Sequence, residues 1–137
     1  AHQKTMLAAL QGKLEMELAQ MSPDDAAELL KEYGIAAPGL AKVIRLSYAL
    51  LGLQSFFTVG EDEVRAWTVR VGANAVEAAG VIHTDLARGF IRAEVISYAD
   101  MISAGDLAEA RKRGVLRLEG KEYVVQDGDI LNIRFNV

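Results

Sequence analysis

The spacing of hydrophobic residues changes along the chain from a period near 3.6 to a period of two. In residues 40–53 apolar side chains recur at steps of three and four. In residues 64–71 they recur mainly at every second position. The first spacing is typical of an amphipathic helix and the second of a strand with one buried face. We therefore predict a helical segment before Phe56 and a mixed segment of strands and helices after it.

The helical segment has clear signals for three helices. Leu14 and Leu18 share one face of a short first helix, which ends by residue 21. Ser22 followed by Pro23 predicts the start of a second helix, because serine caps free amides and proline fits the first helical position. Gly34 is placed to end it. The third helix, over residues 40–53, has an apolar stripe so wide that the preceding helix, another domain or a missing part of the molecule must cover it.

The segment after Phe56 predicts an α+β fold. Residues 56–58 and 64–71 form a hairpin, a helix follows over 74–82, and the next strand buries Ile91, Ala93 and Val95 on one face. The remaining elements are two short helices separated at Gly105 and strands over residues 116–118, 122–125 and 130–135. A hairpin, a helix that crosses back and returning strands suggest a β-grasp, or ubiquitin-like, arrangement.

Composition narrows the function classes. The chain has 137 residues, 51% of them apolar, with a net charge of -4, which disfavours coating nucleic acid by bulk charge. It has no cysteine and only two histidines, so disulfides, thiol chemistry and a zinc centre are not expected. Its apolar runs are too short for a signal-peptide core or a membrane span. We expect a soluble, cytoplasmic, monomeric protein, and the first residue, Ala1, suggests a processed or truncated product.

One polar run stands between the predicted helix and strand at residues 83–85. His83, Thr84 and Asp85 place an imidazole, a hydroxyl and a carboxylate side by side. A histidine that titrates near neutral pH can act as a base or as a pH-sensitive contact. Neighbours at such a joint also hydrogen-bond the local backbone. We predict no catalytic role, and leave two interpretations open, a partner contact and a structural turn.

A basic cluster follows later in the chain. Its members are Arg111, Lys112, Arg113, Arg117 and Lys121. Such a cluster is suited to the phosphates of RNA. Cations at the end of a helix also complement the helix dipole in solvent, with no partner required. Both interpretations stay open.

Three runs occur in a fixed order: EVRAWT at residues 63–68, AAGVIHTD at 78–85 and YVVQDGDI at 123–130. This combination resembles the C-terminal part of the Obg-like ATPase family (YchF), and the shorter IHTD core is shared by TGS domains. The resemblance implies that residues 1–21 are the end of a nucleotide-binding domain and its exit helix. It further implies connecting helices over 22–54 and a TGS domain of the β-grasp fold over 55–137.

Members of the resembled family hydrolyse ATP, in some cases GTP, with magnesium and associate with ribosomes. A phosphate-binding loop around Gly12 and Lys13 would need a glycine at position 7 and a serine or threonine at position 14, but leucine occupies both. We therefore expect no enzyme activity and no cofactor in this chain by itself, with ATP or GTP bound by the absent domain. The resemblance also places a nucleotide-base contact at Gln11, Gly12 and Lys13, although the family usually has Ser-Ala where this chain has Gln11-Gly12.

The expected role is regulation and binding, in which the TGS domain contacts a ribosome, RNA or a protein partner and responds to the P-loop domain of the same polypeptide. A free-standing β-grasp interaction module is one alternative. Another is a small-nucleotide sensor that uses the His83 loop. Ubiquitin-like conjugation is disfavoured because the chain ends in Phe135-Asn136-Val137 rather than Gly-Gly.

Overall fold

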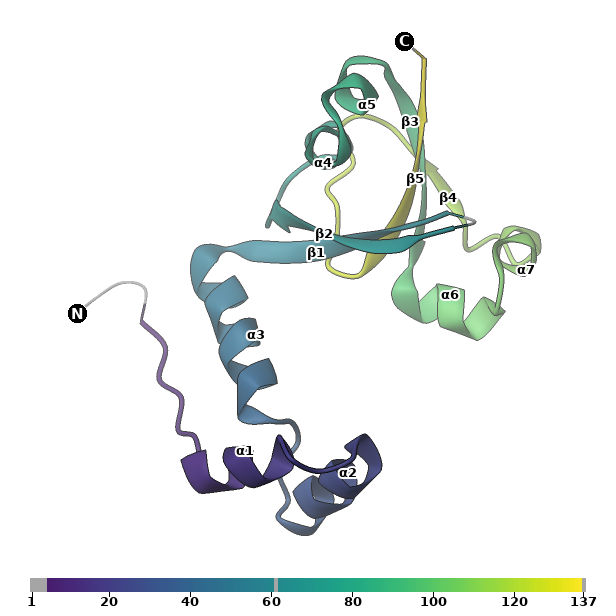
Figure 1. Cartoon of the computed structure of the whole chain (residues 1–137). Helices are drawn as coiled ribbons and strands as arrows, with labels where there is room; N and C mark the ends of the chain where they lie inside the picture. The colour runs from purple at the N-terminus through teal and green to yellow at the C-terminus, as the bar shows by residue number, and fades with distance from the viewer. Residues whose placement is uncertain (1–4, 61, 137) are drawn as a thin grey trace. The chain divides into compact units, whose positions relative to one another are not determined.

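The structure, a computed structural model, describes residues 5–60 and 62–136 (Figure 1). It divides into two compact units between Leu51 and Gly52. This division lies three residues before the predicted one at 54/55. The first strand starts at Leu53. Its second and third residues, Gln54 and Ser55, are both polar, so the start of the strand shows no alternation of apolar and polar residues.

The first unit contains helices α1 (Gly12–Leu18), α2 (Pro23–Glu32) and α3 (Gly39–Leu51). The Ser22 hydroxyl accepts a hydrogen bond from the Asp25 amide at 3.2 Å, and Pro23 is the first residue of α2, as predicted. Gly34 follows the helix with a positive φ of 65°. The Glu15 carboxylate then accepts a hydrogen bond from the Gly39 amide at 2.7 Å, which fixes the start of α3 against α1.

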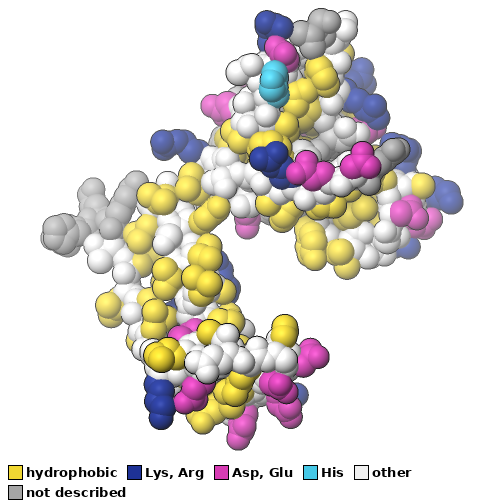
Figure 2. Space-filling model, viewed as in Figure 1, with side chains coloured by type: hydrophobic (Ala, Val, Ile, Leu, Met, Phe, Trp, Pro, Cys, Tyr) yellow, Lys and Arg dark blue, Asp and Glu magenta, His cyan; other side chains and the backbone are white. Residues whose placement is uncertain are grey.

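Most apolar side chains of the first unit are exposed. Leu14 and Leu18 are buried, but on α3 Leu40 is 71% and Ile44 50% exposed. Hydrophobic side chains show over much of the surface of this unit in Figure 2. The other two helices therefore cover only part of the predicted stripe. Among the described residues, no helix is both long and apolar enough to cross a membrane.

The second unit contains five strands and four helices in its described residues. In chain order they are β1 (Leu53–Val59), β2 (Val64–Arg70), α4 (Ala75–Ile82), α5 (Thr84–Arg88), β3 (Phe90–Ser97), α6 (Tyr98–Ala104), α7 (Leu107–Lys112), β4 (Arg117–Glu119) and β5 (Asp129–Phe135). The strands form one sheet in the order β2-β1-β5-β3-β4, with β1 parallel to β5 and the other neighbours antiparallel. The predicted α+β class and β-grasp arrangement are confirmed.

Helices lie on both faces of this sheet (Figure 1). On one face, the small residues of α4 pack against Phe56, Val95 and Leu131. Ala75, Ala78 and Ala79 have no exposed surface, so α4 lies close to the strands. On the other face, α6 and α7 cover a smaller core that includes Ile96, Ala110 and Ile130.

Two predicted strand features are wrong. Ile91 does not share the buried face of Ala93 and Val95, because a register shift between Phe90 and Arg92 makes Ile91 the extra residue and leaves it 50% exposed. Residues 122–125 form no named strand. They make one isolated bridge, between Val124 and Asn74, and their backbone hydrogen-bonds the turn before α4.

Candidate partner-binding site

The His83 side chain is the cap of a helix that the sequence did not predict. Its Nδ1 accepts a hydrogen bond from the Asp85 amide at 3.2 Å, and its φ of -162° is extended backbone. The predicted polar loop is therefore wrong at Thr84 and Asp85, which form the first turn of α5. A histidine acceptor replaces the usual serine or aspartate of such caps, which is why the pattern did not signal a helix.

A local partner also holds the carboxylate of this run. Asp85 lies 2.9 Å from Arg88 Nη2. The His83 side chain is 65% exposed, so its outer edge remains open to solvent. These contacts favour the structural interpretation of residues 83–85. A partner contact through His83, Thr84 and Asp85 stays a prediction.

Acidic side chains accompany most of the predicted basic cluster. Arg111 lies 3.4 Å from Glu94, while Lys112 and Arg113 lie 3.8 and 3.0 Å from Glu109. Lys121 is exposed and has no ion pair among the described residues. The cluster is thus partly neutralised by its own surroundings, and Lys121 and the 78% exposed Lys112 are the members most available to an anion.

Arg117 belongs to a network around a buried carboxylate. Asp129 is 2% exposed and accepts hydrogen bonds from the Tyr123 hydroxyl at 2.8 Å and the Gln126 amide at 2.9 Å. Arg117 donates to the Tyr123 oxygen at 2.9 Å, and its guanidinium lies over the ring. Burial, followed by the hydrogen bond and charge of Asp129, raises the pKa of Tyr123 from 10.0 to about 12.

This pKa predicts a loss of stability in alkali. Because the folded-state pKa of Tyr123 lies above the unfolded value of 10.0, its contribution is complete below that pH and is lost as the pH rises through about 12. Tyr123→Phe removes this dependence, at a cost of about 1 kcal/mol at neutral pH for the lost hydrogen bonds. Urea unfolding of both proteins across this pH range measures the difference. If the free energies of unfolding of the two proteins changed equally with pH, the raised pKa of Tyr123 would be contradicted.

The predicted nucleotide-base residues lie at the start of α1. Gln11 precedes the helix without a side-chain capping bond, and Gly12 and Lys13 form its first turn. They share an open pocket of about 390 Å³ with Glu17 and Tyr33. The Lys13 side chain is 92% exposed and lies 4.0 Å from Glu17. The nucleotide contact stays a prediction.

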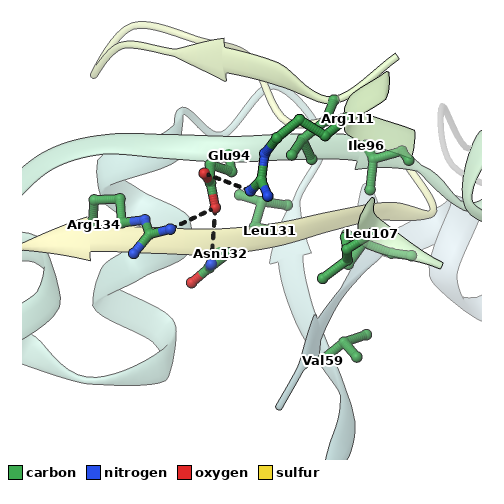
Figure 3. A pocket seen from close by; sticks show the side chains of 10 residues that line it. Val59, Glu94, Ile96, Leu107, Arg111, Leu131, Asn132 and Arg134 are labelled. Atoms are coloured by element: carbon green, nitrogen blue, oxygen red, sulfur yellow. Dashed lines mark hydrogen bonds and ion pairs between the residues drawn. The ribbon is translucent and has the colours of Figure 1, made fainter. Parts of the chain in front are cut away.

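Sequence reasoning missed a polar cluster on the face of the sheet that carries α7. The Glu94 carboxylate lies 3.0 Å from Arg134 and accepts a hydrogen bond from the side-chain Nδ2 of Asn132 at 3.0 Å, in addition to its contact with Arg111 (Figure 3). Glu94 and Arg134 lie 40 residues apart in the sequence. Only the pairing of β3 with β5, with Glu94 opposite Asn132, brings them together.

No group of three His, Asp or Glu side chains in the described part of the chain is placed to hold a metal ion. The surface of the second unit offers exposed cations and apolar side chains.

Comparison with known proteins decides the family. The family model YchF-GTPase_C, described as a protein of unknown function (DUF933), matches residues 53–136, which is most of the chain. The chain belongs to the YchF family. The predicted resemblance is thereby confirmed, and the match spans nearly the whole second unit.

Curated YchF relatives extend the similarity into the first unit. The ribosome-binding ATPase YchF of Bacillus subtilis is 52% identical over 91% of this chain, and that of Haemophilus influenzae is 55% identical over 90%. Obg-like ATPase 1 of Caenorhabditis elegans is 46% identical over 96%. The aligned region is 33 to 34% of each relative, so the chain spans about a third of their length.

A solved YchF structure shows the same fold. The Schizosaccharomyces pombe YchF GTPase superposes on 91% of this chain with a TM-score of 0.79 and 37% sequence identity, and the match covers 33% of that structure. The helical first unit and the five-stranded second unit are thus the C-terminal portion of a YchF-family architecture.

Proposed function

We propose that this chain is the C-terminal regulatory and binding portion of an Obg-like P-loop ATPase or GTPase, and that its second unit is a TGS domain that contacts the ribosome. The observation that carries the proposal is the 52 to 55% identity with proteins named ribosome-binding ATPases. In this proposal hydrolysis, with its ATP or GTP and magnesium, belongs to the nucleotide-binding domain of the longer polypeptide.

The exposed cations support a focused contact with ribosomal RNA. The chain as a whole is acidic, so attraction to phosphates depends on local cations. Lys112 ends α7, and Lys121 lies in the turn after β4. Lys121 has no ion pair among the described residues, and Lys112 is 78% exposed beside Glu109, whereas Arg117 lies 3.9 Å from the buried Asp129. We therefore assign the phosphate contact to Lys112 and Lys121, with Arg113 beside them.

Ribosome co-sedimentation of the 137-residue chain tests this assignment. Lys112→Glu/Lys121→Glu is expected to weaken pelleting about tenfold near 0.1 M salt and to reduce the salt slope by about one for each lost phosphate contact. Lys31→Glu/Arg45→Glu, which changes the net charge equally on the first unit, is the control. Equal pelleting of the two double variants would overturn the assignment.

The nucleotide-sensor alternative makes a separate prediction. Titration of ATP, GTP and guanosine tetraphosphate into the chain would then give saturable binding that His83→Ala weakens. If no nucleotide binds saturably, the nucleotide-sensor alternative is ruled out, while the proposal of a ribosome contact still stands.

A further inference from the structure

The sheet has an opening between β1 and β5. These two strands are parallel neighbours, but they pair only at Phe57 and Ile130. Beyond that pair β1 continues to Val59 along β2, and β5 continues to Phe135 along β3. The two strands therefore separate, and within the part of the chain that the structure describes, residues 132–135 pair with β3 alone.

The open side of β5 carries backbone groups that can pair. In an antiparallel ladder alternate residues direct their N–H and C=O groups to the same neighbour, and the residues between them direct theirs away. Since β5 is antiparallel to β3, alternate residues of 132–135 present these groups toward the opening. An exposed row of this kind is a template for an added strand.

A pocket borders the opening on the face that carries α4 and α5. It has a volume of about 430 Å³, and its apolar lining includes Trp67, Ile82, Leu86 and Ile133. Ile82 and Leu86 flank the polar run at residues 83–85. The apolar residues that flank this polar run, rather than the run itself, therefore line the pocket.

A smaller pocket of about 150 Å³ lies on the opposite face (Figure 3). Ile96 and Leu107 form part of its apolar lining, and Arg111 and Arg134 contribute guanidinium groups. The two pockets share Val59, Leu131 and Asn132, the residues on either side of the opening. One extended segment in the opening would therefore meet both pockets.

The exposed charge of the smaller pocket is positive. Glu94 is only 14% exposed, whereas the Arg111 and Arg134 side chains are 63% and 55% exposed. Each arginine contacts Glu94 through its Nη2 atom, which leaves other guanidinium nitrogens for an incoming group. A carboxylate that approaches from solvent meets the two cations before it meets Glu94.

We propose that the opening between β1 and β5 binds an extended segment of a partner protein in which apolar and acidic side chains alternate. The segment pairs with the free side of β5. Successive side chains of a strand point to opposite faces, so its apolar residues enter the larger pocket and its acidic residues reach Arg111 and Arg134. This site needs no ribosome, and its test is independent of the function proposed above.

A synthetic peptide tests the site directly. A capped peptide of about seven residues, an ordinary strand length, carries glutamate alternating with valine or phenylalanine. Titration into the isotope-labelled 137-residue chain is expected to shift the amide signals of residues 58–60 and 132–135. A peptide of the same composition without alternation is the control. Methylation of the peptide amides that face β5 should abolish binding, whereas methylation of the other amides should not.

Side-chain variants give effects of opposite sign. Glu94→Gln frees both arginines from their internal partner and is expected to tighten binding about two- to fivefold, while Arg111→Gln/Arg134→Gln weakens it about tenfold. A role of these residues in folding alone would not tighten binding. Arg70→Gln, at the other end of the hairpin, is the matched control and should change nothing.

Three results would overturn the proposal. One is a Kd for the alternating peptide that is weaker than about 1 mM. The others are amide-signal shifts centred on the exposed apolar residues of α3 instead of β5, and equal affinity of the alternating and control peptides.

Discussion

Phe56→Ala is expected to destabilise the second unit by about 3–5 kcal/mol. The Phe56 ring has no exposed surface and lies in the main core, where β1 meets α4 and β5. Its removal leaves a cavity that the backbones of three elements must close, and such cavities collapse incompletely. Since a domain is stable by only about 5–15 kcal/mol, the loss is a large part of the total.

Urea unfolding followed by the fluorescence of Trp67, the cross-strand neighbour of Phe56, measures this loss. Phe135→Ala removes the same side chain at a position that is 45% exposed and is expected to cost about 1 kcal/mol or less. If the two variants lost equal stability, the core described here would be wrong.

Gly89→Ala is expected to cost about 3 kcal/mol for a different reason. Gly89 has an ordinary φ of -92°, so its backbone conformation admits alanine. An added Cβ, however, would overlap the carbonyl oxygen of Asn136 and lie 2.8 Å from its carbonyl carbon. Because these are backbone atoms, the end of β5 must move, and the 2.9 Å hydrogen bond from the Asn136 amide to the Gly89 carbonyl is lost.

Gly80→Ala is the matched control for this prediction. Gly80 lies within α4, where an added Cβ would be 3.5 Å from the Ala87 Cβ, an ordinary contact. Helix propensity then favours alanine by up to about 1 kcal/mol. Thermal unfolding should show a lower Tm for the Gly89 variant and an equal or higher Tm for the Gly80 variant. The reverse order would contradict the close contact between Gly89 and Asn136, the residue that follows β5.

The sequence predicted the elements whose signals are local. Ser22, Pro23 and Gly34 mark the ends of α2 through side-chain and backbone chemistry within a few residues. The strands β2 and β5 follow largely from alternation, whereas β1 was predicted only over residues 56–58 of Leu53–Val59. Ile91 was misplaced because the extra residue in β3 depends on its pairing with β5, a contact between distant segments that period-two reasoning cannot include.

The partners of the predicted basic residues could not be read from the sequence for a similar reason. The cations at Arg111 and Arg117 looked like a free cluster in the sequence, but their partners Glu94 and Asp129 are distant along the chain. The opening between β1 and β5 also has no local signal, since it arises where paired strands separate. Within the IHTD run, His83 accepts a hydrogen bond from the local backbone and Asp85 pairs with the side chain of Arg88.

Competition for ribosomes tests the central claim, that this chain is the binding portion of a YchF-family protein. The 137-residue chain is mixed with ribosomes in the absence of nucleotide, and full-length YchF of Haemophilus influenzae is then added in excess. The account predicts that the chain pellets with ribosomes to saturation and that the full-length relative displaces it. A chain that stays in the supernatant, or that remains bound when the relative is saturating, would contradict it.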